Sequence, residues 1–137
     1  SMKSAVLWRE LRDVAPFVAE PERPVWRLSV PPREGPRVAA EIAGATDAAY
    51  FYDWGGGLIW VALPADDALE GAGAGLVRAA LGAAGGHATL VRAAEELRAA
   101  VPVFQPQEPA KAALTARVKD GFDPNRVLNP GRMYAGV

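Results

Sequence analysis

The chain has 137 residues, of which 50% are hydrophobic and 23% charged, and its formal net charge is -1. These values are typical of one globular domain and exclude a disordered chain. The balanced charge, with no basic run, argues against nucleic acid as a partner. No cysteine is present and His87 is the one histidine, so disulfides and thiol chemistry are excluded and we expect no metal site.

The N-terminal segment predicts a short helix and gives no sign of membrane targeting. No apolar run approaches the roughly 20 residues that cross a bilayer, and a signal-peptide pattern is missing, so we expect a soluble, intracellular protein. Ser1 before Met2 is typical of tag removal, which favours a piece of a longer protein. Residues 4–15 carry apolar side chains at helical spacing, and a Pro-bearing linker continues to residue 24.

The next segments alternate between strand and helix patterns. Trp26, Leu28 and Val30 recur at a period of two, which predicts a strand. Pro36 then suits the first turn of a helix, whose apolar stripe ends at Gly44.

A hairpin, a second helix and a fourth strand complete this pattern. Residues 49–54 and 58–63 are rich in aromatic and branched side chains and are joined through three glycines at 55–57. Residues 76–84 carry a second helical stripe, and residues 87–91 read as a strand. The order strand, helix, strand, strand, helix, strand predicts an α+β fold, a ferredoxin-like split βαβ sandwich with helices on one face of an antiparallel sheet.

A helical extension and a turn-rich tail follow the core. Helical spacing predicts helices over residues 94–100 and 110–120. In the tail, Asp123 can cap a turn that begins with Pro124, and Asn129-Pro130-Gly131 fits a type II turn. We expect three parts within one structural domain, namely residues 1–24, 25–92 and 93–137.

The tail carries the most specific sequence pattern. Phe122-Asp123-Pro124 followed by Val127-Leu128-Asn129-Pro130-Gly131-Arg132 resembles the chain terminus of the FAD-linked oxidases of the vanillyl-alcohol oxidase type. Within that superfamily, the chain is similar almost end to end to a glycolate oxidase subunit, through residues 7–9, 26–32, 53–57, 85–92 and 132–137.

This resemblance implies the C-terminal cap domain of a cytoplasmic FAD-dependent 2-hydroxy acid oxidase subunit, with membrane association only through partner subunits. Its implied partners are an N-terminal FAD-binding domain of the same subunit, a sister flavin subunit, an iron-sulfur subunit and a small 2-hydroxy acid such as glycolate. The glycines at 55–57 join two strands and do not open a helix that would meet a phosphate, so we expect FAD in the full-length protein and neither FAD nor activity in this piece alone. A non-catalytic assembly module and a free-standing small-molecule sensor are the alternatives.

Five residues are candidates for the site. His87 can act as a general acid or base near the flavin, or be a hydrogen-bonded structural residue. Arg27 can hold a substrate carboxylate, or be solvated at an edge or pair with Asp53. The resemblance assigns Asn129, Gly131 and Arg132 to cofactor contact or the interdomain seam. Of the tryptophans, Trp8, Trp26 and Trp60 are expected in the core, and Trp54 is not.

Overall fold

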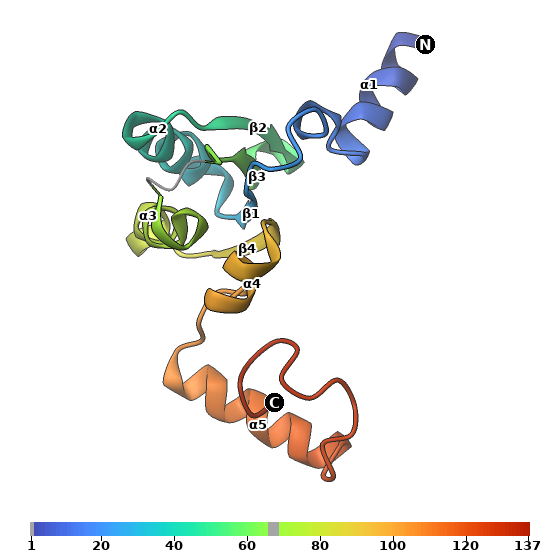
Figure 1. The fold of residues 1–137 in the computed structure, drawn as a ribbon, viewed down its shortest axis with the longest axis vertical. Coiled ribbons are helices and arrows are strands. Elements are labelled where there is room, and N and C mark those ends of the chain that lie inside the picture. The colour runs from blue at the N-terminus through green and yellow to red at the C-terminus, as the bar shows by residue number, and fades with distance from the viewer. Residues whose placement is uncertain (1, 66–68) are drawn as a thin grey trace.

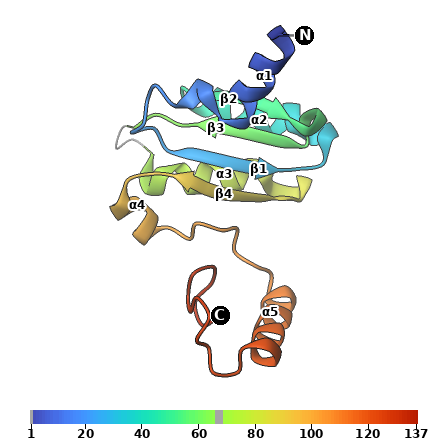
Figure 2. The ribbon, with the colours of Figure 1, turned by 90° about the vertical axis from the view of Figure 1, so that its right-hand side faces the viewer.

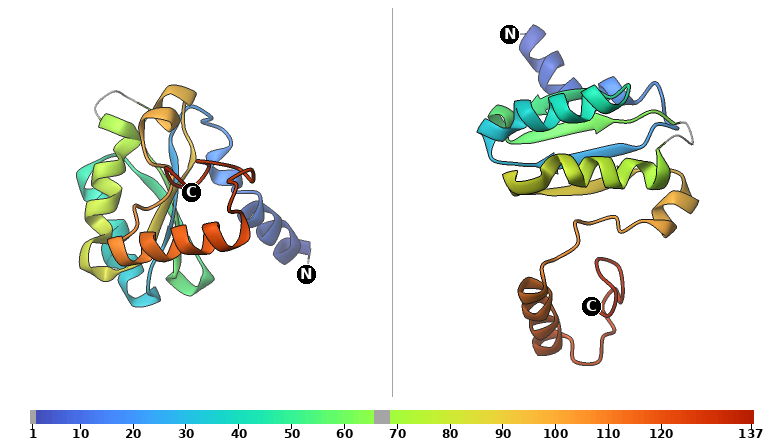
Figure 3. Two further views of the ribbon diagram at one scale, coloured as in Figure 1. Left: turned by 90° about the horizontal axis from the view of Figure 1, so that it is seen from below. Right: turned by 90° about the vertical axis from the view of Figure 1, so that its left-hand side faces the viewer.

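The computed structural model describes residues 2–65 and 69–137, and its centre is a four-stranded antiparallel sheet (Figure 1). The strands lie in the order β2-β3-β1-β4. Their bounds are β1 Val25–Ser29, β2 Ala49–Asp53, β3 Leu58–Ala62 and β4 His87–Arg92. Helices α2 (Gly35–Ala45) and α3 (Ala74–Leu81) cover one face of the sheet (Figure 3). This is the predicted ferredoxin-like α+β fold.

The main core lies between the sheet and these two helices. Trp26 and Leu28 of the central strand β1 are fully buried because their side chains point toward the helices. Burying large apolar side chains in this way is the main favourable contribution to folding. The remaining fully buried large side chains come from both helices, from β3 and the residue that follows it, and from β4: Val38, Ile42, Ile59, Val61, Leu63, Val77 and Leu90.

The opposite face of the sheet is covered only in part, by the N-terminal segment (Figure 2). Phe17 packs there with Val25 and Ala62 in a second apolar cluster, against which Trp60 also lies. Arg92 fixes this segment because its guanidinium donates to three of its backbone carbonyls, those of residues 17, 20 and 23, at 2.8–3.2 Å. The rest of this face, toward the start of β4, is the open sheet face discussed below.

The N-terminal helix differs from the prediction in its end and in its packing. Helix α1 (Met2–Arg12) ends before residue 15 because Val14 adopts a left-handed φ of 52°. The helix projects away from the sheet (Figures 1 and 2), and Trp8 is 63% exposed. The expected core position of Trp8 is therefore wrong in this chain, whereas Trp26 is buried and Trp54 is exposed as predicted.

The C-terminal extension leaves the sheet at β4. Helix α4 (Glu95–Ala100) is followed by residues 101–107, here called the linker, and then by helix α5 (Pro109–Phe122). Both helices were predicted. Figures 1 and 2 show α5 and the tail lying beyond the β4 side of the sheet. Within residues 2–65 and 69–137, no helix is long and apolar enough to cross a membrane.

Candidate functional site

A pocket of about 840 Å³ lies where the open sheet face meets the C-terminal extension. The sheet contributes Arg27, His87 and Thr89. The extension contributes linker residues 104–107 together with Glu108, Lys111 and Tyr134. The volume falls within the range of about 300–1,000 Å³ that is usual for small-molecule sites. The fold thus brings together the two candidates Arg27 and His87, which are 60 positions apart in the sequence.

Arg27 lies in the middle of the central strand β1, between Trp60 of β3 and Thr89 of β4. Its side chain is half-buried and points to the open face, opposite to the buried side chain of Trp26. The guanidinium lies 5.8 Å from the centroid of the Trp54 ring, a cation–π contact that restricts its orientation. Because β1 is paired on both sides, Arg27 is not at a sheet edge.

The alternative pairing of Arg27 with Asp53 is not observed among the described residues. The Asp53 carboxylate accepts a hydrogen bond from the backbone N–H of Trp54 at 2.7 Å, at the start of the hairpin turn. In the part of the chain that the structure describes, no salt bridge to Arg27 is formed, although Glu108 lies on the lining of the same pocket. A guanidinium of this kind can bind a carboxylate through two parallel hydrogen bonds.

His87 is the first residue of β4 and stands opposite Ser29 of β1. Its side chain is exposed and lines the same pocket as Arg27. An exposed imidazole on the pocket lining can donate a hydrogen bond to a bound molecule or accept one from it.

The linker forms the wall that sequence reasoning missed. The backbone N–H of Leu90 donates to the Val103 carbonyl at 2.9 Å, and that of Ala88 donates to Oε1 of Gln105 at 3.4 Å. These bonds hold the linker along the outer edge of β4. Phe104 then meets Tyr134 of the tail, with ring centroids 6.2 Å apart. Three prolines at 102, 106 and 109 were the available sequence signal for an extended segment here.

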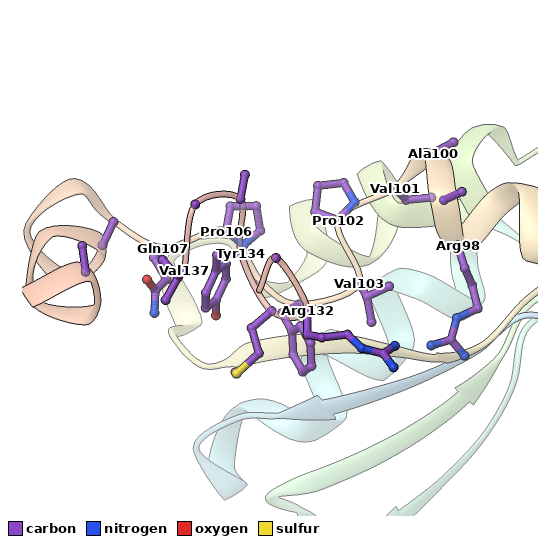
Figure 4. A pocket seen from close by; sticks show the side chains of 18 residues that line it. Arg98, Ala100, Val101, Pro102, Val103, Pro106, Gln107, Arg132, Tyr134 and Val137 are labelled. Atoms are coloured by element: carbon purple, nitrogen blue, oxygen red, sulfur yellow. The ribbon is translucent and has the colours of Figure 1, made fainter. Parts of the chain in front are cut away.

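A second pocket of about 730 Å³ lies between the linker and the tail (Figure 4). It shares Phe104 and Tyr134 with the first pocket, and its lining includes Gly131 and Arg132. Both of these residues are exposed. The candidate Asn129 is also exposed and lines neither of these two pockets.

The predicted turns of the tail are present. The N–H of Arg132 donates to the Asn129 carbonyl at 3.3 Å, and Gly131 has a φ of 70°, as a type II turn requires. At the other turn, the Asp123 carboxylate accepts from the N–H groups of Val127 and Leu128 at 3.0 and 2.9 Å.

Asp123 makes the order of the tail dependent on pH. Its hydrogen bond with Lys119 and those from Leu128 and Val127 lower its pKa from the ordinary value of 3.8 to about 2. Because the folded pKa is the lower one, this stabilisation is present above about pH 4 and is lost as pH falls toward 2. In an NMR titration, the amide shifts of Val127 and Leu128 should change with a midpoint near 2.

Matched variants test this assignment. Asp123→Asn should abolish the titration and shift both amides already at pH 7. Asp120→Asn, in the last turn of α5 and paired with the exposed Arg126, should leave the titration unchanged. A midpoint at 3.8 in the unsubstituted protein would show that the carboxylate is not held by these bonds.

The fold and pockets define a ferredoxin-like α+β domain with a charged site on its open sheet face. No protein-family model matches the chain, and no solved structure does. The chain resembles part of the glycolate oxidase subunit GlcE of Escherichia coli (strain K12), with 32% identity over 131 residues. This match covers 93% of the chain and 31% of GlcE, so the chain spans about a third of the length of this curated relative.

Proposed function

We propose that this chain is the C-terminal cap domain of a subunit of an FAD-dependent 2-hydroxy acid oxidase, with glycolate as the model substrate. The similarity to part of GlcE, a glycolate oxidase subunit by name, supports the reaction class. The convergence of Arg27 and His87 on one pocket of the open sheet face carries the proposal for this domain. In the proposed enzyme, an FAD-binding domain of the same subunit faces this pocket. A sister flavin subunit and an iron-sulfur subunit complete the complex.

The side chains of the pocket fit the anion of a 2-hydroxy acid. Arg27 holds the carboxylate through its two terminal nitrogens, and Lys111 adds a second positive charge to a lining that also contains Glu108. His87 lies on the same lining and holds or accepts the proton of the substrate hydroxyl. The walls formed by Phe104 and Tyr134 exclude water from one side of the bound anion.

The tail offers a contact to the cofactor but not a complete cofactor site. FAD bound by its own domain would supply the hydride acceptor for oxidation at the substrate α-carbon. Gly131 has open space around its α-carbon, since a Cβ there would meet no atom within 4 Å, and the neighbouring Arg132 is exposed. Together with Asn129, these residues would contact the cofactor or the seam between the two domains.

Substitution of Arg27 in the full-length protein tests this function. Arg27→Ala should raise KM for glycolate about tenfold to a hundredfold, because a charge-assisted hydrogen bond contributes about 1.5–3 kcal/mol. Arg27→Lys should raise KM less than Arg27→Ala does. Arg33→Ala is the control, because the Arg33 side chain is 85% accessible, and it should leave KM unchanged. His87→Ala should lower kcat. Steady-state kinetics on purified complexes measure both constants.

The assembly module is a second candidate because the extension exposes several large apolar side chains. Those of α5 and the tail are 51–88% exposed: Leu114, Val118, Phe122, Val127 and Leu128. Size-exclusion chromatography of the same variants separates the two functions. Lost turnover in an intact complex supports the cap domain, and unchanged turnover in all of the pocket variants contradicts it.

A further inference from the structure

Arg78 is the one charged residue of α3, yet it lies on the side of that helix that faces the core. Ala74 and Leu81, one turn to either side on the same face, are 6% and 3% exposed. The Arg78 guanidinium lies 5.6 Å from the ring centroid of the fully buried Trp26. Burial lowers the pKa of Arg78, but an arginine stays charged at physiological pH. Arg78 is half-buried, and its charge is stabilised there by hydrogen-bond acceptors.

The acceptors are two carbonyls of the linker. One terminal nitrogen of Arg78 donates to the carbonyl of Pro102 and, at 3.3 Å, to that of Phe104. The carbonyl between them, that of Val103, accepts from Leu90 of β4. The linker is thus bound on both sides, by β4 through one carbonyl and by Arg78 through its two neighbours. This alternation is that of an extended strand.

Of the two other guanidinium nitrogens of Arg78, Nε is left unsatisfied. This Nε is buried and has no hydrogen-bond partner among the described residues. An unsatisfied buried donor is unfavourable. The side chain nevertheless adopts this arrangement, in which Nε lacks a partner and both hydrogen bonds to the linker are formed.

We propose that Arg78 is a positioning residue that fixes the linker against β4 and thereby sets the wall of the pocket that contains Arg27 and His87. The linker residues from Phe104 to Gln107 line that pocket, and Phe104 also contacts Tyr134 of the tail. Arg78 itself does not line the pocket. The effect of Arg78 on substrate binding rests on the proposed function. Its role in fixing the linker does not depend on that function.

Hydrogen exchange at the Leu90 amide tests the hold on the linker without any ligand. In Arg78→Met the apolar stem that packs on Trp26 is kept and the donors are lost, so exchange at Leu90 should accelerate about tenfold to a hundredfold relative to β3 amides. Arg37→Met is the matched control, because Arg37 also donates to a backbone carbonyl, that of Ala80 in α3, but does not reach the linker. Arg78→Lys keeps the charge and should accelerate exchange less than Arg78→Met does.

The outcomes separate this proposal from the proposed function. If Leu90 exchanges in Arg78→Met no faster relative to β3 than in Arg37→Met, Arg78 does not position the linker. Should Arg78→Met not fold, Arg78→Leu, which also removes the donors and keeps an apolar side chain, is compared with Arg37→Met in the same way. In the full-length enzyme, Arg78→Met should raise KM for glycolate, with rescue by Arg78→Lys. Faster exchange at Leu90 with unchanged KM would support the hold on the linker and overturn its link to the pocket.

Discussion

Replacing Trp26 by alanine is expected to lower the free energy of unfolding by about 3–5 kcal/mol, which is the usual loss for a buried tryptophan. The side chain is fully buried in the central strand, and its Nε1 donates to the Ala72 carbonyl at 2.8 Å. The substitution therefore opens a cavity, removes the partner of a buried carbonyl and takes away the ring beneath Arg78. Since small domains are stable by about 5–15 kcal/mol, much of the protein should unfold at moderate denaturant.

Trp54→Ala is the matched control, because this ring is 70% exposed on the hairpin turn. It should change the free energy of unfolding by less than about 1 kcal/mol. Urea titrations followed by far-ultraviolet circular dichroism measure both variants without relying on tryptophan fluorescence. Equal losses in the two variants would contradict the core described here.

Gly86→Ala is expected to lower the free energy of unfolding by about 3 kcal/mol or more, as much as Trp26→Ala. The cause is backbone geometry. Gly86 has a φ of 106°, and a Cβ at this position would lie 2.1 Å from the carbonyl oxygen of Ser29. Because that atom belongs to the backbone of β1, β4 would have to move away at its first residue, His87. The same variant should therefore disturb the site as well as the fold.

Gly44→Ala provides the contrasting case. A Cβ at Gly44, near the end of α2, would meet nothing within 4 Å, and the position is helical. Alanine there should stabilise the protein by up to about 1 kcal/mol, since glycine loses more conformational freedom in a helix. Thermal unfolding of Gly86→Ala and Gly44→Ala should show a lower melting temperature for the first and a higher one for the second. A Gly86→Ala variant as stable as the unsubstituted protein would refute the close approach of β4 to β1.

The sheet and its helices could be predicted because their signals are local. Trp26 and Leu28 alternate with polar residues, and the stripes of α2 and α3 end at glycines, so each element is specified within a few positions. The packing of α1 could not be predicted in this way. Its apolar side chains are compatible with burial, but the helix projects from the sheet and Trp8 is exposed.

Of the candidate pocket, only the sheet residues could be predicted from the sequence. Arg27 and His87 follow from strand positions, and the sheet order brings them to one pocket. The linker wall depends on contacts between residues far apart in the sequence. Arg78 and Pro102 are 24 positions apart, and the hydrogen bond from Ala88 to Gln105 spans 17. No periodicity encodes such contacts, because they arise only when α3, β4 and the linker meet.

The linker along β4 also has a consequence for solubility. By accepting from Leu90 it occupies backbone groups at one edge of the sheet, which would otherwise be free to pair with another chain. A substitution that releases the linker therefore exposes a strand edge at the same moment that it opens the pocket. Loss of site order and self-association should appear together, so aggregation during purification would be an early sign of a displaced linker.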